Sequence, residues 1–265
     1  MFAHVEGRIS VLLAAREMND IARSARAPQL HRNASRFKPI ALVLALSTIA
    51  PLLTNAQPVD TLDSSPAIGD TILLDLKAFA LDAVELVAMP GRWNADDWAI
   101  AGGSIATTGA LMAADDDVRS MALRNQDSTG RRVADISNSF GAVGLSLGVS
   151  GGLYVTGLAF DLPVVRRAGR HVAQSLLYAG LLTTTIKFVA GRQRPHYEGG
   201  PHVYKAFTSD DRYYSLPSGH ATIAFAMASS LAADIDHPAA TVALYSVATL
   251  TAASRVYVDR HWASD

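Results

Sequence analysis

Three short motifs in the second half of the chain carry the residue types that a phosphoryl-transfer site needs. The three fixed cations among them would offset a phosphate monoester, which carries about two negative charges near neutral pH. Ser218 and the backbone N–H of Gly219 add hydrogen-bond donors where a loop runs into a helix. The motifs are Lys187 with Arg194 and Pro195, then Pro217-Ser218-Gly219-His220, then Ser254-Arg255 with His261 and Asp265.

The two histidines of these motifs have different neighbours and therefore predict different roles. Asp265 follows His261 by one helical turn and can accept a hydrogen bond from one ring nitrogen, which leaves the other unprotonated. His261 is therefore the predicted nucleophile, and a phosphohistidine would follow. His220 has no carboxylate in its own motif, so it is the predicted general acid. His196 and His202, between the first two motifs, are assigned to loop surface.

The spacing Lys-x6-Arg-Pro, Pro-Ser-Gly-His and Ser-Arg-x5-His-x3-Asp resembles the type 2 phosphatidic acid phosphatase (PAP2) and vanadium haloperoxidase superfamily, from about Asp97 to Asp265. The resemblance implies that the first motif and Arg255 bind phosphate, that His220 is the acid, and that His261 is the nucleophile. It implies a metal-independent phosphatase without a cofactor. The expected substrate is a phosphomonoester or pyrophosphate of a lipid, either phosphatidate-like or undecaprenyl pyrophosphate-like.

Three alternatives stay open for the function. A soluble periplasmic nonspecific acid phosphatase would act on small phosphate esters. A vanadate-dependent haloperoxidase would hold vanadate, a phosphate mimic, at the same residues, but the chain is short for that class. A non-catalytic envelope protein would keep the fold and bind phosphorylated lipid head groups.

The resemblance also predicts a missing last helix, because relatives continue past the position of Asp265. We therefore expect a C-terminally truncated domain in which Asp265 lies near a frayed end and holds His261 poorly.

Composition limits the class of protein. The 265 residues allow one domain plus appendages, and the net charge of −1 gives no reason to expect a nucleic-acid partner. The lack of cysteine excludes a disulfide scaffold and a thiol nucleophile. The run Asp115-Asp116-Asp117 lacks the alternating ligands of a calcium loop and is assigned to a solvated helix end, so no metal site is expected.

The N-terminal segment has the pattern of an export signal. Basic residues precede the apolar stretch 40–53, and small residues before Gln57 offer a cleavage site. This predicts an N-terminal extension and signal peptide over residues 1–56, a linker over 57–71 and the phosphatase domain over 72–265. The protein is then exported to the cell envelope, with its active site on the periplasmic or outer face. An uncleaved membrane anchor is the alternative.

The remaining sequence has helical periodicity and predicts an all-α, antiparallel helical bundle. The first motif follows one helix, the second begins the next and the third ends the one after, so an antiparallel bundle would bring all three to one end. The expected helices cover residues 73–89, 98–114, 136–160, 172–186, 221–233 and 238–254.

Helix length leaves membrane embedding open, because only 136–160 comfortably exceeds the roughly 20 residues that a spanning helix needs. Two features favour a membrane-associated protein over a soluble one. They are glycines at four-residue intervals, at Gly144, Gly148 and Gly152, and a basic cluster of Arg166, Arg167 and Arg170 that is assigned to a short loop opposite the site.

Overall fold

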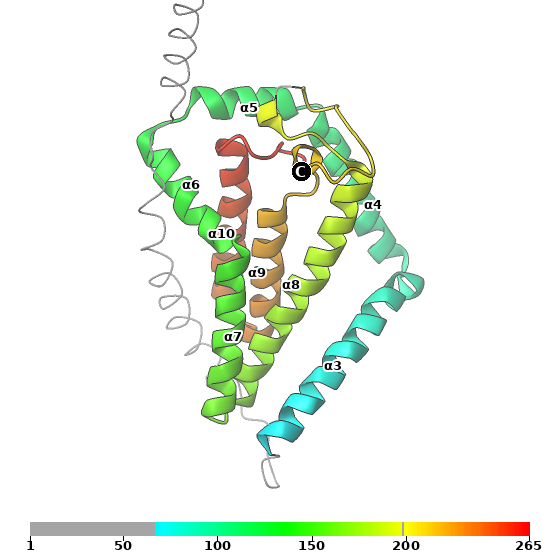
Figure 1. Ribbon diagram of the computed structural model, residues 1–265, viewed down its shortest axis with the longest axis vertical. Coiled ribbons are helices and arrows are strands. Elements are labelled where there is room, and N and C mark those ends of the chain that lie inside the picture. The colour runs from blue at the N-terminus through cyan, green and yellow to red at the C-terminus, as the bar shows by residue number, and fades with distance from the viewer. Residues whose placement is uncertain (1–66, 198) are drawn as a thin grey trace, which may run out of the picture. The chain divides into compact units, whose positions relative to one another are not determined.

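The computed structural model describes residues 67–197 and 199–265, all within the second of the chain's two units, Ala41–Asp265. These residues form eight α-helices and no strand, which confirms the predicted all-α fold (Figure 1). The expected signal peptide lies outside the described residues. The helices are α3 (Ile68–Ala88), α4 (Ala95–Met112), α5 (Asp115–Arg124), α6 (Ser128–Phe140), α7 (Val143–Ala159), α8 (Pro163–Ala190), α9 (Gly219–Ile235) and α10 (Pro238–Tyr257).

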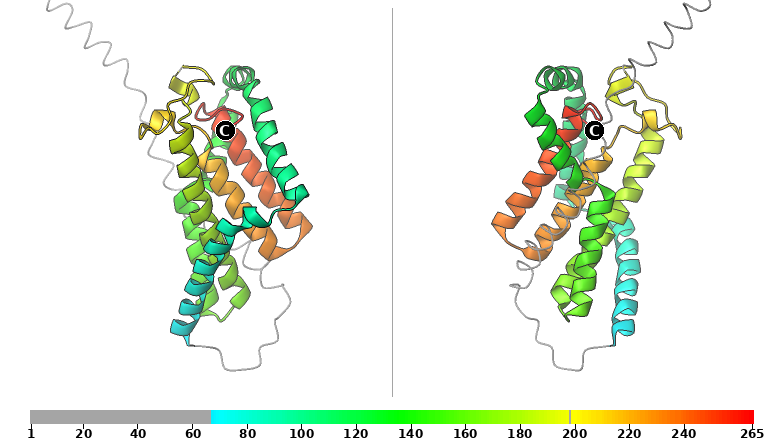
Figure 2. Two further views of the ribbon diagram at one scale, coloured as in Figure 1. Left: turned by 90° about the vertical axis from the view of Figure 1, so that its right-hand side faces the viewer. Right: turned by 60° about the vertical axis from the view of Figure 1, so that its left-hand side comes forward.

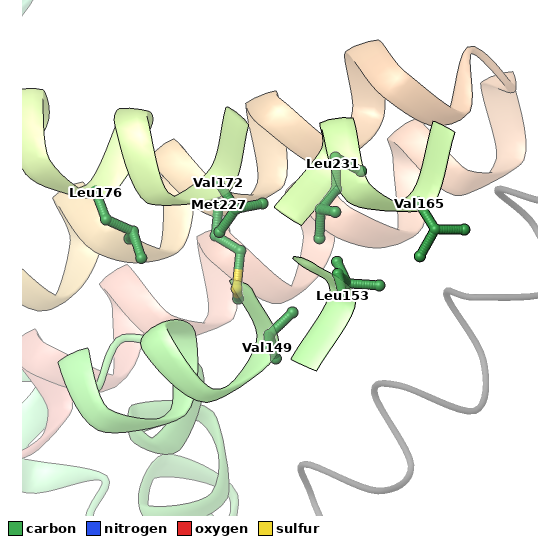
Figure 3. Packing of buried hydrophobic residues seen from close by; sticks show 8 residues of the cluster. Val149, Leu153, Val165, Val172, Leu176, Met227 and Leu231 are labelled. Atoms are coloured by element: carbon green, nitrogen blue, oxygen red, sulfur yellow. The ribbon is translucent and has the colours of Figure 1, made fainter. Parts of the chain in front are cut away.

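The hydrophobic core lies where α7, α8 and α9 pack against one another (Figure 3). Leu153 of α7, Val172 of α8 and Leu231 of α9 are all completely buried. Burying each such side chain contributes about 1.5–3 kcal/mol. Helices α7 and α8 approach closely at Gly157, where a Cβ atom would lie 2.3 Å from the backbone nitrogen of Arg166. Glycine does bring two helices together here, whereas a Cβ atom on Gly144 would meet nothing within 4 Å.

The segment expected as one helix over residues 136–160 is two helices. Helix α6 ends at Phe140, α7 begins at Val143, and the two are bent by 48°. At the break the backbone of Gly141 lies close to the start of α9. A Cβ atom on Gly141 would lie only 2.6 Å from the carbonyl oxygen of His220. The chain turns here because α6 crosses α10, where Thr251 Oγ1 donates to the Ser137 carbonyl over 2.9 Å.

The basic cluster opposite the site is helical, and its assignment to a loop is wrong. Helix α8 begins at Pro163, a residue whose fixed φ favours the first helical position, so all three arginines lie in its first turns. They are also ion-paired. Arg166 and Arg170 contact Asp75 of α3 at 3.2 and 3.5 Å, and Arg167 contacts Asp234 of α9 at 3.6 Å. The cluster therefore joins three helices.

Helices α3 and α4 differ from the rest of the bundle because they bury little. Helix α3 begins at Ile68, so the last residues of the expected linker are helical, and its only buried residue is Thr71. Helix α4 begins with a capping box between Asn94 and Asp97 and has no buried residue at all. Large apolar side chains on both helices face outward, including Val87 and Ile105, which are 84% and 74% exposed.

One helix among the described residues, α8, is long and apolar enough to cross a membrane, and the bent pair α6 and α7 would make a second if it formed one span. Core helices of soluble proteins have the same length and composition, so this finding does not assign a membrane span.

Candidate active site

The three motifs meet at one end of the bundle, as the order of the helices predicts. Figures 1 and 2 show the end of α8, the start of α9 and the end of α10 at the same end, beside α5. Lys187 lies in the last turn of α8, Ser218 immediately precedes α9, and Arg255 lies in the last turn of α10. Three segments far apart in sequence therefore supply one site.

Asp265 is bound tightly to His261. His261 Nδ1 lies 3.1 Å from Asp265 Oδ2, and because an ionised carboxylate only accepts, Nδ1 carries the proton and Nε2 is left with a lone pair. The carboxylate also accepts from Trp262 N at 2.9 Å, from Arg192 Nη1 at 2.8 Å and from Ser215 Oγ. Its side chain is fully buried. The expectation that Asp265 frays is therefore wrong, because four donors hold it.

His261 and Asp265 are paired as predicted, but not because they are one helical turn apart. Helix α10 ends at Tyr257, so His261 and Asp265 lie in the non-helical segment after it rather than on one helical face. The turn is held by the N–H groups of Arg260 and His261, which both donate to the Arg255 carbonyl, at 3.0 and 3.3 Å. The turn thus ties the dyad to the arginine of the same motif.

The second motif presents donors at the start of α9. Ser218 N donates to the Asp265 carbonyl over 2.8 Å, which joins the second motif to the third. The Ser218 side chain is buried, and its hydroxyl has no partner among the described residues. The first N–H groups of a helix also have no partner within it. A Cβ atom on Gly219 would lie 3.9 Å from Lys187 Cε, so the first motif lies directly beside this helix start.

The two cations of the first motif donate hydrogen bonds to backbone carbonyl oxygens. Lys187 Nζ donates to the carbonyls of Tyr214 and Ser215, over 2.7 and 3.1 Å. Arg194 Nε donates to the Asp211 carbonyl over 3.1 Å. The remaining donors of these side chains are available to an anion.

Arg255 is oriented by a residue that the sequence did not indicate. Its Nη1 donates to Asn138 Oδ1 over 2.9 Å, and Ser254 Oγ donates to the same oxygen over 2.8 Å. The Nε of Arg255 is buried without a partner among the described residues. Asn138 therefore fixes the guanidinium of Arg255, while the Nε donor of that guanidinium stays unused.

The charges of the site act on one another. Burial, with repulsion by Arg194 next, lowers the pKa of Lys187 to about 8. Burial, followed by repulsion from Arg194 and Arg260, lowers the pKa of Arg255 to about 10. These mutual repulsions mean that the site favours an anion, which would relieve them.

Both histidines are neutral at pH 7. Burial lowers the pKa of His220 to about 4, and the positive charge of Arg255 adds to this. Burial also lowers the pKa of His261 to about 4, although Asp265 opposes the shift. A neutral His261 whose Nδ1 proton faces a carboxylate has the protonation state of a nucleophile.

The structure adds residues that sequence reasoning missed or misassigned. Asp115 is completely buried, not solvated, and Arg192 Nη2 donates to its carboxylate over 2.6 Å. Arg192 lies inside the first motif, but its spacing gave no signal for a partner 77 residues away.

His196 is half-buried, with Nδ1 at 3.2 Å from the Asp259 carbonyl, and His202 is exposed. The described residues contain no group of three or more His, Cys, Asp or Glu that could hold a metal ion.

The comparisons with known proteins agree with this geometry. A family model described as the PAP2 superfamily matches residues 168–265, which include all three motifs. Members of that superfamily are phosphatases and haloperoxidases. Comparisons with curated proteins and with solved structures found no match. The resemblance carried by the three motifs thus extends over residues 168–265, where the chain is similar to the PAP2 superfamily.

Proposed function

We propose that this protein is a phosphatase that hydrolyses a phosphate ester of a lipid through a phosphohistidine at His261. The observation that carries the proposal is the hydrogen bond between His261 Nδ1 and Asp265, which leaves Nε2 unprotonated in a ring that also feels the charges of Lys187 and Arg194. The neighbouring donors, including the unpartnered Ser218 hydroxyl, suit the oxygens of a phosphoryl group.

The first step forms the covalent intermediate. His261 Nε2 attacks phosphorus and forms a P–N bond, while the bond between phosphorus and the alcohol oxygen breaks. His220 gives its proton to the departing oxygen, so the alcohol leaves neutral. Lys187, Arg194 and Arg255 stabilise the charge on the equatorial oxygens, and Asp265 offsets the positive charge that develops on the His261 ring.

His220 needs a proton for this role, although its pKa in the free site is about 4. A bound phosphate dianion would raise that pKa, because it places negative charge among the cations that now lower it. Substrate binding would therefore bring the acid into its active form.

The second step regenerates the enzyme. A water molecule attacks phosphorus, the P–N bond breaks and His261 recovers its lone pair. His220, which lost its proton in the first step, accepts one from the water, and inorganic phosphate leaves. No metal or other cofactor takes part in this scheme.

The proposed substrate is a lipid phosphate or pyrophosphate, and the proposed location is the outer side of the cell envelope at a membrane surface. The outward apolar side chains of α3 and α4 support this, because helices that bury almost nothing in the bundle leave a large apolar surface to be covered. In this proposal α3 and α4 lie against the membrane that holds the substrate.

The test measures phosphate release from phosphatidate in mixed micelles and from p-nitrophenyl phosphate, by the wild type, His261→Ala and His202→Ala. We expect the wild type and His202→Ala to release phosphate with preference for the lipid, and His261→Ala to release none. Preference for the aryl ester would favour an acid phosphatase. Release from neither substrate would contradict the proposal, and bromide oxidation with vanadate and peroxide would then indicate a haloperoxidase.

A further inference from the structure

A buried charged network lies behind the His261–Asp265 pair. Arg192 is completely buried and donates in two directions, from Nη1 to Asp265 over 2.8 Å and from Nη2 to Asp115 over 2.6 Å. The Asp115 carboxylate also accepts from the Ser264 N–H at 3.0 Å and from the Ser264 hydroxyl at 2.6 Å. The Nε of Arg192 donates to the Pro201 carbonyl over 3.0 Å. Asp115 is thus bound to the dyad through one guanidinium.

The charges in this network explain why a second carboxylate is useful there. A guanidinium beside Asp265 alone would cancel most of the negative charge that Asp265 directs at His261, because neither group is screened by solvent. With Asp115 on its other side, Arg192 is shared between two carboxylates, and the buried set keeps one net negative charge. Asp265 is then held in place and still acts on His261 as an anion.

We propose that Asp115 is a positioning residue for the phosphoryl-transfer reaction: by pairing with Arg192 it preserves the negative charge that Asp265 presents to His261. This inference rests on the proposed role of His261. Asp115 begins α5 and lies outside residues 168–265, so a residue of the preceding helices would complete the site.

The groups around His261 determine the sign of the expected effect. Asp265 favours the protonated ring, while Lys187 and Arg194 disfavour it. His220 is the other titratable group nearby and is itself neutral. Removing the charge of Asp115 leaves Arg192 to offset Asp265, so the surroundings of His261 become more positive. The ring becomes a weaker base and a weaker nucleophile.

The experiment compares Asp115→Asn with Asp116→Asn, its exposed neighbour in the same helical turn. In Asp115→Asn we expect kcat to fall roughly tenfold with KM nearly unchanged, the lower end of the loss seen when the partner that orients a metal-ligating histidine is removed. The titration midpoint of His261, followed by NMR of ¹³C-labelled histidine, should shift to lower pH. Asp116→Asn should change neither quantity.

Two further variants separate charge from packing. Ser264→Ala removes the hydroxyl that donates to Asp115 and accepts from Arg192 Nη1, but it keeps the backbone N–H bond to Asp115 and all the charges, so the midpoint of His261 should stay at the wild-type value. The double variant Asp115→Asn/Arg192→Gln removes one charge of each sign and restores the single net negative charge, so its midpoint should return toward the wild type. A purely structural role predicts instead that the double variant is at least as perturbed as Asp115→Asn.

The outcomes distinguish this inference from the function on which it rests. If the wild type is active, His261→Ala is inactive, and Asp115→Asn changes neither kcat nor the midpoint, the role of Asp115 is overturned and the function stands. If the wild type releases no phosphate, the function fails, while the NMR midpoints still show whether Asp115 acts on His261. A midpoint that shifts equally in Ser264→Ala would overturn the charge argument.

Discussion

Arg255 Nη1 donates to Asn138 Oδ1 over 2.9 Å, and this bond joins the third motif to α6. Because the same oxygen accepts from Ser254 Oγ, one amide fixes two consecutive residues of the motif. Asn138, like Asp115, precedes the segment that matches the PAP2 superfamily. The preceding helices therefore orient Arg255, a cation of the proposed phosphate site.

Replacing Asn138 by alanine should weaken phosphate binding. The guanidinium of Arg255 would lose its fixed acceptor, and a hydrogen bond to a charged group contributes about 1.5–3 kcal/mol. We expect KM for the phosphate ester to rise roughly tenfold or more, since 1.4 kcal/mol is a factor of ten. The matched control is Ser139→Ala, whose hydroxyl bonds only within α6. An unchanged KM in Asn138→Ala would show that the hydrogen bond from Arg255 to Asn138 does not affect substrate binding.

Adding a methyl group at Gly141 should disturb His220. The new Cβ atom would lie 2.6 Å from the His220 carbonyl oxygen and 2.8 Å from Thr251 Cγ2, so the backbone must shift. Overpacking of this kind costs about 1–3 kcal/mol. Thermal unfolding should show a lower Tm for Gly141→Ala, and kcat should fall. Gly151→Ala, where a Cβ atom meets nothing within 4 Å, should keep both. Equal Tm values for the two variants would contradict the close approach.

Stability should fall as the pH is lowered from 6.5 toward 4. Burial holds the pKa values of His220 and His261 at about 4, below the ordinary 6.5, so within this window the unfolded chain binds protons that the folded chain does not. The free energy of unfolding therefore rises with pH across the window and is highest above it. For His261 alone the effect is on the order of 3 kcal/mol.

Urea unfolding at several pH values checks this dependence. His261→Gln should show a flatter profile than the wild type, because one of the two groups no longer titrates. His202→Gln, at an exposed position, should keep the wild-type profile. A profile of His261→Gln as steep as that of the wild type would mean that His261 is not held neutral.

A chelator should leave phosphate release unchanged. The groups proposed to hold the phosphate are cations and neutral donors, and the carboxylate of the third motif, Asp265, is occupied by four donors of the protein. We expect the same kcat/KM with and without EDTA after dialysis. Orthovanadate should inhibit competitively, as a mimic of phosphate at the same residues. Loss of activity in EDTA that Mg²⁺ restores would contradict the metal-independent scheme.

The sequence predicted those features that depend on local pattern. Apolar periodicity located α3, α4, α7, α8, α9 and α10, but it missed α5 and all but the end of α6. The order of the motifs along the helices predicted that Lys187, His220 and His261 would meet. The break at Gly141 could not be predicted in this way, because its cause is the approach of His220 from a helix 79 residues later. An unbroken apolar run has the same pattern whether or not another helix crosses it.

The charged residues show the same limit. The solvated position predicted for Asp115 rested on its neighbours Asp116 and Asp117, which are indeed exposed. Its burial depends on Arg192 and Ser264, 77 and 149 residues away. Likewise the arginines at the start of α8 have their partners on α3 and α9. Periodicity and spacing contain no information on such distant pairs.

The phosphohistidine is the central claim, and trapping it is the most direct test. The wild type, His261→Ala and His202→Ala are mixed with ³²P-labelled phosphatidate and quenched in alkali, in which a phosphoramidate survives. We predict label on the wild type and on His202→Ala, mapped by peptide sequencing to His261, and none on His261→Ala. Turnover by the wild type without any label on His261, or label retained in His261→Ala, would contradict the account.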